Sequence, residues 1–255
     1  MSRGTALITG ASSGIGEALA LKFSQEGFDL VLTARRQDRL QALKDKLEGG
    51  RVTIFTADLT TDEGLIGLCR FVEEQRIDVD ILINNAGMLV HDSFEDASED
   101  QLRQSIALNI TALTRLIYHF LPKMKERRAG RILNVASVAA FNPIPGMDLY
   151  AATKAYVLSL TESLSESLRD SGVSLTALCP GLTETEGMDQ RLAANLPPFL
   201  IGTPEEVALE GYDALMQQEV IRIPGNANKL AVALAQHQPR WLVRGLGGLA
   251  SRFTR

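Results

Sequence analysis

A glycine-rich segment near the N-terminus constrains the fold more than any other feature of the chain. Ala6–Ile8 is typical of a short buried strand, and Glu17–Phe23 is typical of a helix. Gly10, Gly14 and Gly16 lie between them with the spacing G-x-x-x-G-x-G, which differs from the pattern G-x-G-x-x-G. Glycines at such a turn let the backbone approach a pyrophosphate closely, while the N–H groups that begin the helix face the anion. The segment predicts a strand, a turn and a helix that bind a nucleotide.

Strand-like and helix-like segments alternate along the rest of the chain. This alternation predicts one α/β domain over residues 1–255, a Rossmann-like, doubly wound parallel sheet with helices on both faces. A length of 255 residues and a hydrophobic content of 45% agree with one such domain. The expected strands after Ala6–Ile8 are Asp29–Ala34, Arg51–Ala57, Ile81–Asn84, Gly130–Ala136, Val173–Cys179 and Val220–Ile223. The expected helices include Gln37–Leu47, Asp62–Glu74, Gln101–Lys125 and Leu149–Arg169.

A tyrosine and a lysine, Tyr150 and Lys154, are spaced as i and i+4 in the last of these helices. Such positions lie on one face of a helix, so the two side chains are expected side by side. A lysine charge favours the ionised phenolate, and Lys154 is therefore expected to lower the pKa of Tyr150 below its ordinary value of about 10. The pair is a candidate acid–base device.

Several motifs follow one another in an order that is highly specific. The chain carries the glycine turn, then Asn84-Asn85-Ala86-Gly87, Asn109, Ser137, Tyr150, Lys154 and Pro180-Gly181. Through these motifs, the stretch from about Thr5 to Thr185 resembles the classical short-chain dehydrogenase/reductase family. Extended relatives that epimerise nucleotide sugars have a different glycine spacing and a longer substrate domain. The resemblance implies a catalytic tetrad of Asn109, Ser137, Tyr150 and Lys154.

The resemblance also implies a nicotinamide cofactor, bound beyond the carboxyl ends of the strands near the switch in strand order. Asp58, after the third strand, matches the family position that approaches the adenine amine. The expected cofactor contacts are Gly10, Ser12, Ser13, Gly14, Ile15, Gly16, Arg35, Arg36, Asp58, Leu59, Asn85, Ala86, Gly87, Tyr150, Lys154, Pro180, Gly181, Thr183 and Thr185.

The end of the second strand distinguishes the two nicotinamide cofactors. A carboxylate about 20 residues beyond the glycines binds the ribose 2′-hydroxyl of NAD, whereas an arginine accommodates the 2′-phosphate of NADP. Here Arg35 and Arg36 follow the strand, and two guanidinium groups suit bidentate binding of a phosphate. Ser13 stands where many NADP-preferring relatives have a second basic group. The sequence predicts that NADP(H) is preferred over NAD(H).

The family resemblance implies a role for each member of the tetrad. Tyr150 would donate a proton to a carbonyl oxygen as hydride reaches the carbon, and Ser137 would orient that oxygen. Lys154 would bias Tyr150 and hold the nicotinamide ribose, while Asn109 would anchor a water that connects Lys154 to solvent.

The expected function is NADPH-dependent reduction of a ketone or aldehyde, acyl and steroid-like compounds included, to an alcohol. Two alternatives remain open. One is a dehydrogenase that oxidises a hydroxy acid or an amino alcohol with NADP, and the other is a catalytically idle regulator that senses nucleotides. Regulators of the second kind usually lose the tyrosine or the lysine, and this chain has both.

Three segments are expected to select the substrate: Met88–Asp96, Val138–Leu149 and Leu182–Ile201. The third contains glycine and two prolines, and it predicts a substrate lid over residues 182–203. Apolar side chains in these segments favour an apolar carbonyl compound, although packing against the body explains many of them equally well. They are Val138, Phe141, Ile144, Met147, Met188, Leu192 and Phe199.

Residues 225–255 form an expected amphipathic extension in which leucines alternate with arginines. It is expected to fold over the substrate entrance or to contact another subunit, with an anionic membrane surface or the phosphate of an acyl carrier as the alternative. The helices Gln101–Lys125 and Leu149–Arg169 pack against symmetry mates in the family, which implies a homodimer or a homotetramer.

Charge and composition limit the other partners. The net charge of −5 argues against a nucleic-acid surface, and no uncharged apolar run reaches the length of about 18 residues that a membrane span needs. The first residues lead directly into a strand without a signal peptide, so a soluble, cytoplasmic protein is expected. Cys69 and Cys179 are interpreted as buried hydrophobic residues, and no metal site is expected. The remaining partner is a small-molecule carbonyl compound or alcohol.

Overall fold

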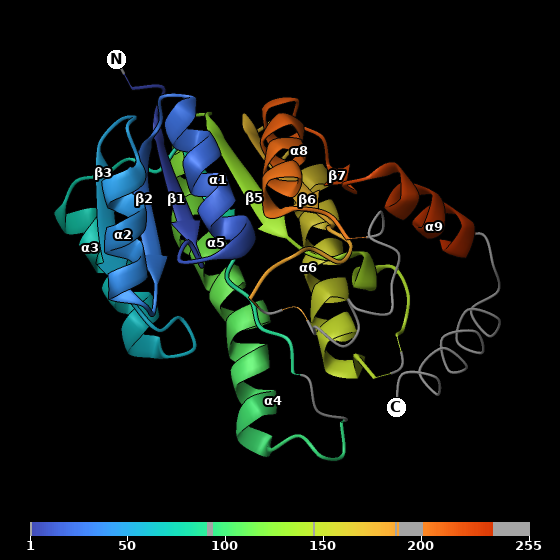
Figure 1. Ribbon diagram of the computed structural model, residues 1–255. Coiled ribbons are helices and arrows are strands. Elements are labelled where there is room, and N and C mark those ends of the chain that lie inside the picture. Colours follow the sequence, from blue (N-terminus) through green and yellow to red (C-terminus); the bar gives the residue numbers. More distant parts are fainter. Residues whose placement is uncertain (1, 91–93, 145, 187, 189–200, 237–255) are drawn as a thin grey trace.

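The centre of the computed structural model is a parallel sheet with helices packed on both faces (Figure 1). The structure describes residues 2–90, 94–144, 146–186, 188 and 201–236. Within them, seven strands pair in the order β3-β2-β1-β4-β5-β6-β7. The sheet confirms the predicted Rossmann-like fold. The strands are β1 (Thr5–Thr9), β2 (Asp29–Ala34), β3 (Val52–Thr56), β4 (Ile81–Asn84), β5 (Gly130–Val135), β6 (Val173–Leu178) and β7 (Ile221–Arg222).

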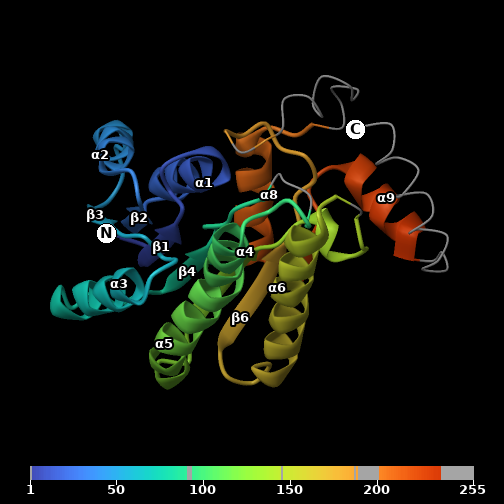
Figure 2. The ribbon, with the colours of Figure 1, turned by 90° about the horizontal axis from the view of Figure 1, so that it is seen from below.

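The helices divide between the two faces of the sheet. Figure 2 shows α1, α2 and α8 on one face and α3, α5 and α6 on the other. Helix α9 follows β7 at the end of the described chain, and a short 3-10 turn, η2 (Val138–Ala140), precedes α6. The helices are α1 (Gly14–Gln25), α2 (Gln37–Lys46), α3 (Asp62–Glu74), α4 (Glu99–Ile106), α5 (Leu113–Glu126), α6 (Asp148–Ser167), α8 (Pro204–Met216) and α9 (Asn226–Gln236).

Two hydrophobic clusters hold these layers together because successive strand residues point to opposite faces of a sheet. In β1, Leu7 belongs to the cluster beneath α3, α5 and α6, whereas Ile8 belongs to the cluster beneath α1, α2 and α8. Phe23 of α1 makes an edge-to-face contact with Tyr212 of α8, with ring centroids 5.1 Å apart. Cys179 is buried and Cys69 is half-buried, and both are free thiols.

The predicted helix Gln101–Lys125 is interrupted in the structure. A π-helical turn, η1 (Ala107–Ala112), joins α4 to α5 and contains Asn109. Periodicity alone does not reveal such a turn, since one wide turn leaves the apolar stripe nearly unchanged. Several strands also end one residue earlier than the sequence predicts, and β7 contains only Ile221 and Arg222 rather than Val220–Ile223.

The order of the strands creates a crevice. The chain runs outward from β1 through β2 to β3, then crosses back so that β4 pairs with the other side of β1. In such sheets, the connections at the carboxyl ends of the two central strands diverge and leave room for a ligand. The glycine turn after β1 and the N-N-A-G segment after β4 therefore meet at this point.

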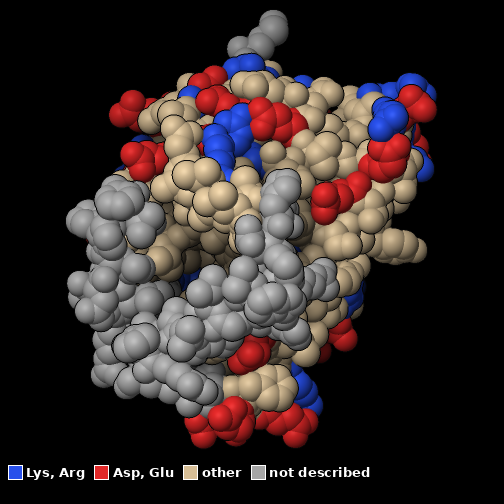
Figure 3. Space-filling model, turned by 90° about the vertical axis from the view of Figure 1, so that its right-hand side faces the viewer, with Lys and Arg blue, Asp and Glu red and all other residues tan. Residues whose placement is uncertain are grey.

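Ion pairs join the last described elements. Arg222 of β7 pairs with Glu219 and lies 3.4 Å from Glu210 of α8, and Lys229 of α9 lies 3.6 Å from the same carboxylate. Figure 3 shows acidic and basic side chains side by side on the face that carries these elements. The first part of the predicted extension 225–255 forms α9, and the remainder lies outside the described residues. No helix in the described part of the chain has the length and apolar character to cross a membrane.

Candidate active site

The glycine turn brings backbone very close to backbone at the end of β1. Gly10 and Gly14 have positive φ angles of 67° and 57°, a conformation that other residues rarely adopt. A Cβ atom on Gly16 would lie 2.2 Å from the carbonyl oxygen of Gly10. Helix α1 starts at Gly14, and the side chain of its N-cap, Ser13, makes no capping hydrogen bond, so the first N–H groups remain available to an anion. This geometry fits a pyrophosphate group.

Hydrogen bonds fasten the turn to the end of β4. The hydroxyl of Thr9 accepts hydrogen bonds from the N–H groups of Asn85 and Ala86, both at 3.0 Å. In return, the Asn85 amide donates to the carbonyl oxygens of Thr9 at 2.9 Å and Gly10 at 3.2 Å. Because the two strands flank the switch in strand order, these bonds fix the width of the crevice at its floor.

A cavity of about 780 Å³ opens above this floor and collects almost all of the predicted site residues. This volume is within the range of sites for cofactors and drug-sized ligands. Gly16 and Asn109 do not line it, because Gly16 is packed against the glycine turn and Asn109 is buried behind the wall. The predicted residues in the lining are Gly10, Ser12, Ser13, Gly14, Ile15, Arg35, Arg36, Asp58, Leu59, Asn85, Ala86, Gly87, Ser137, Tyr150, Lys154, Pro180, Gly181, Thr183 and Thr185.

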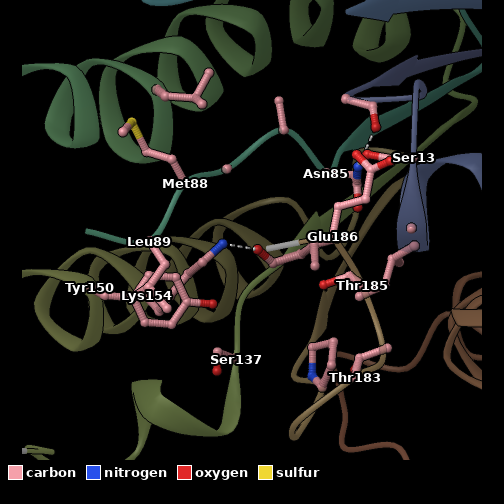
Figure 4. A pocket seen from close by; sticks show the side chains of 18 of the residues that line it. Ser13, Asn85, Met88, Leu89, Ser137, Tyr150, Lys154, Thr183, Thr185 and Glu186 are labelled. Atoms are coloured by element: carbon pink, nitrogen blue, oxygen red, sulfur yellow. Dashed lines mark hydrogen bonds between the residues drawn. The ribbon is translucent and has the colours of Figure 1, made fainter. Parts of the chain in front are cut away.

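Three polar side chains meet at one end of the cavity, where α6 passes the end of β5. Figure 4 shows Tyr150 and Lys154 on this side, with Ser137 below them. The Lys154 ammonium donates to the carbonyl oxygen of Val135 at 2.7 Å, and its nitrogen lies 5.6 Å from the centroid of the Tyr150 ring. The Ser137 side chain is held by the backbone two residues further on, since its hydroxyl accepts from the N–H of Ala139 at 3.1 Å.

The expected lowering of the Tyr150 pKa is wrong for this structure. Burial raises the pKa of Tyr150 above its ordinary value, and a hydrogen bond from Ser137 opposes the rise. Burial also lowers the pKa of Lys154 to about 8, against a smaller opposite effect of the neighbouring Cys179. The Lys154 ammonium is hydrogen-bonded to the Val135 carbonyl. The loss of water around the phenol decides the direction in which the Tyr150 pKa shifts. Tyr150 is therefore a protonated phenol at neutral pH.

Asn109 lies in the π-helical turn, and both polar atoms of its side chain form hydrogen bonds. Its Oδ1 atom accepts from the N–H of Met88 at 2.9 Å, and its Nδ2 atom donates to the Met88 carbonyl at 2.9 Å and to Thr153 Oγ1 at 3.1 Å. Thr153 in turn donates to the carbonyl oxygen of Tyr150 at 2.8 Å. The expected role of Asn109 as an anchor for a water next to Lys154 is not tested by these contacts. They tie the segment after β4 to the helix that carries Tyr150.

The far end of the cavity carries the two predicted arginines. Arg36, the N-cap residue of α2, directs its guanidinium back to the glycine turn and donates to Ser13 Oγ at 2.8 Å and to Ser12 Oγ at 3.2 Å. Arg35 is exposed beside Asp58. Partial burial would raise the pKa of Asp58, but hydrogen bonds from Thr60 and the charge of Arg35 lower it on balance. A basic edge thus lies at the end of β2.

A family model described as short chain dehydrogenase matches residues 4–196. The chain belongs to the short-chain dehydrogenase family. An uncharacterised oxidoreductase of Bacillus subtilis, YvrD, is 38% identical over 186 residues, which cover 71% of this chain and 69% of the relative. The family is one of oxidoreductases that bind NAD(P), so this short-chain dehydrogenase is an enzyme of that class and the resemblance drawn from the motifs is confirmed.

Two solved structures are similar over nearly the whole short-chain dehydrogenase chain. The bulky-bulky ketone specific alcohol dehydrogenase from Comamonas testosteroni is 32% identical, with a TM-score of 0.80, and the match covers 98% of this chain and 95% of that one. A short-chain dehydrogenase from Sphingobium yanoikuyae in complex with NADPH is 36% identical, with a TM-score of 0.79 and coverage of 97% and 95%.

Within the described residues, the segments that the sequence predicts to select the substrate bring apolar side chains to the cavity. Val138, Ile144, Met147 and Met188 line the cavity as the sequence predicts. Phe141 does not, because it packs against the hydrophobic cluster beneath α6. Leu192 and Phe199, and most of the predicted lid, lie outside the described residues.

Several lining residues belong to the segments that the sequence predicts to select the substrate, but the sequence does not single them out individually. Met88 and Leu89 follow the N-N-A-G segment, Leu182 follows Pro180-Gly181, and Glu186 lies four positions further along the same loop. Their location next to a recognised motif is the signal that could have found them. Among the described residues, no cluster of three or more histidine, cysteine or acidic side chains could hold a metal ion.

Proposed function

We propose that this enzyme reduces a ketone or aldehyde with an apolar body to the alcohol and uses NADPH as the reductant. The proposal is carried by one observation: Tyr150 and Ser137 meet at one end of a cavity whose other end holds the glycine turn and two arginines. A proton donor and a site for a phosphorylated dinucleotide therefore lie in the same cavity, where a bound cofactor could extend from one to the other.

The chain's own residues supply the proton and its orientation. Tyr150, a protonated phenol at neutral pH whose pKa burial raises further, donates to the carbonyl oxygen as negative charge develops there. Ser137 holds the same oxygen from the β5 side. Lys154 and its partner Val135 hold the base of the pocket, and Gly87 leaves room there, since a Cβ on it would lie 3.4 Å from Lys154 Nζ. A bound nicotinamide supplies the hydride for the carbonyl carbon.

The preference for NADPH rests on the charge at the end of β2. A ribose 2′-phosphate needs cations, and Arg36 already points toward the glycine turn while Arg35 lies beside Asp58. A 2′-hydroxyl would instead be held by a carboxylate at the end of that strand, where this chain has arginine. The related structure from Sphingobium yanoikuyae contains NADPH, which agrees with this assignment.

The apolar lining supports a ketone with bulky hydrocarbon groups. Val138, Ile144, Met147 and Met188 offer no charge to a carboxylate or an amine. This favours reduction of an apolar ketone over oxidation of a hydroxy acid or an amino alcohol. The similarity to the bulky-bulky ketone specific alcohol dehydrogenase points the same way. A catalytically idle nucleotide sensor would not need the phenol, the hydroxyl and the ammonium together.

We also propose a homodimer or homotetramer built on α4, α5 and α6. Tyr118 of α5 is 82% exposed, and Ile106 and Tyr156 are also exposed large side chains on these helices. An interface would remove such surface from water. Sedimentation at micromolar concentration tests this, and a monomer would contradict it. The cytoplasmic location stays a prediction of the sequence.

The experiment is a steady-state survey of purified protein. Ketones of increasing bulk, a hydroxy acid and an amino alcohol are each combined with NADPH, NADH, NADP or NAD. The proposal expects the highest kcat/KM for a bulky, uncharged ketone with NADPH. Turnover that is confined to the hydroxy acid, or that is faster with NADH, would contradict it.

A further inference from the structure

One carboxylate lies where the loop that follows β6 reaches the start of α2. Glu186, in the loop between β6 and α8, pairs with Arg36 at 2.7 Å and with Arg39, one turn further along α2, at 3.5 Å. Arg36 divides its guanidinium, with one terminal nitrogen on Glu186 and the other on the hydroxyl of Ser13 at 2.8 Å. Figure 4 shows Ser13 and Glu186 together on the side of the cavity opposite Tyr150.

The loop that carries Glu186 is held against the glycine turn. Thr185 lies so close to Gly14 that a Cβ on that glycine would be 2.9 Å from Thr185 Cγ2. Behind it, the loop is paired with Gly202: the N–H of Glu184 donates to the Gly202 carbonyl at 3.0 Å, and Thr183 and Gly202 form a parallel bridge. Glu186 is thus held next to the arginines by a backbone that is anchored on both sides.

Two guanidinium groups around one carboxylate make the same donor arrangement that recognises a phosphate. Arg36 and Arg39 cannot give the same N–H groups to Glu186 and to a phosphate at once. A dianionic phosphate placed between the arginines would also be repelled by the carboxylate at short distance. A ribose 2′-hydroxyl in the same place has no charge, so both arginines can stay paired with Glu186 when it binds.

We propose that Glu186 is a built-in competitor of the ribose 2′-phosphate for Arg36 and Arg39, and that it sets how strongly the enzyme prefers NADPH over NADH. This inference rests on the proposed function, because it assumes that the arginines bind that phosphate. Release of Glu186 accompanies binding of the phosphorylated cofactor, whereas NADH binds with the ion pairs intact. Arg39 thereby becomes a specificity residue beside the two arginines that the strand end supplies.

The test measures binding alone. Dissociation constants are determined by calorimetry for 2′,5′-ADP, which has the 2′-phosphate, and 5′-ADP, which lacks it, and by fluorescence for NADPH and NADH. Glu186→Gln removes the competing charge and keeps the side-chain shape. Glu184→Gln is the matched control, since it removes the same charge from the same loop at an exposed residue for which the structure gives no ion pair to the arginines.

Half-exposed ion pairs are weak, so the effect is modest. Glu186→Gln is expected to tighten 2′,5′-ADP and NADPH by about two- to tenfold and to leave 5′-ADP and NADH unchanged. Glu184→Gln is expected to change none of the four. In an Arg36→Ala background the effect of Glu186→Gln should become smaller, because one of the contested donors is absent.

Two results would overturn the inference. Weaker binding of both NADPH and NADH by Glu186→Gln would mean that the carboxylate closes over the bound cofactor, and an equal or absent change in all four ligands would mean that it does not compete. A different result would contradict the proposed function: an Arg36→Ala variant that keeps the full preference for NADPH. If Arg36→Ala lowers the preference for NADPH but Glu186→Gln changes none of the dissociation constants, only this inference is contradicted.

Discussion

Lys154 and Tyr150 stand one turn apart on α6, with the lysine nitrogen 5.6 Å from the centroid of the tyrosine ring and hydrogen-bonded to the Val135 carbonyl at 2.7 Å. The ammonium therefore packs beneath the phenol and is anchored to β5. In this arrangement Lys154 lines the cavity beside Tyr150, and burial of the two side chains, rather than attraction between them, decides the direction of their pKa shifts.

The buried ammonium is expected to destabilise the protein in the absence of cofactor. Its pKa falls from 10.5 to about 8, and at about 1.36 kcal/mol per unit this is a cost of about 3 kcal/mol at neutral pH. Lys154→Met removes that cost and loses a hydrogen bond worth about 1 kcal/mol. The variant should be more stable than the wild type by about 1–2 kcal/mol at pH 7, measured by urea unfolding.

The sign of the pH dependence follows from the lowered pKa. Above about pH 10.5 the lysine is neutral in both states and costs nothing. As the pH falls to about 8, the unfolded chain takes up the proton first, so the wild type loses stability, and below that the cost is constant. The advantage of Lys154→Met should thus shrink between pH 8 and pH 10. Lys125→Met, at an exposed lysine, is the control, and a pH-independent difference for Lys154→Met would contradict the account.

Asn109→Ala should loosen the segment after β4. It removes both partners of the Met88 backbone and a donor to Thr153, and unpaired buried groups cost about 1–3 kcal/mol. Unfolding in urea should show a loss of that size, and NADPH should bind more weakly because Gly87 lies against Asn109. Thr111→Ala, at an exposed position of the same π-helical turn, should change stability by less than about 0.5 kcal/mol. Equal losses in the two variants would refute this role.

Arg36→Ala should lower the preference for NADPH. Charge-assisted hydrogen bonds are worth about 1.5–3 kcal/mol, so NADPH affinity should fall by about ten- to a hundredfold while NADH affinity changes little. Arg35→Ala is expected to act in the same direction, since Arg35 lies beside Asp58 at the cavity edge. Fluorescence titration with both reduced cofactors decides the matter. Tighter binding of NADH than NADPH by the wild type would show that the arginines serve another purpose.

Most of the fold could be predicted because its signals are local. The glycine turn, the apolar strands and the Tyr150–Lys154 spacing each depend on neighbouring residues, and β4 begins and ends at the residues that the sequence predicts, Ile81 and Asn84. The order of the motifs along the chain then indicates where their strand ends converge, because a parallel sheet gathers those ends at one edge.

What could not be predicted depends on contacts between distant segments. The π-helical turn exists where Asn109 reaches Met88, 21 positions earlier, and the pair of Arg36 with Glu186 spans 150 positions. The pKa of Tyr150 is likewise set by burial, which spacing on a helix does not reveal. The hydrophobicity of Phe141 suits a substrate pocket and a core equally well, and the sequence cannot distinguish the two; in the structure Phe141 packs against the core.

The central claim is that Tyr150 donates the proton, and Tyr150→Phe tests it most directly. The ring and its packing remain while the hydroxyl is lost, so NADPH binding measured by fluorescence should change little. General acid catalysis contributes about 10²–10⁴-fold, and kcat for the best ketone found with the wild type should fall by that factor. A variant that keeps more than about a tenth of the wild-type rate, with NADPH still bound, would contradict the assignment of Tyr150.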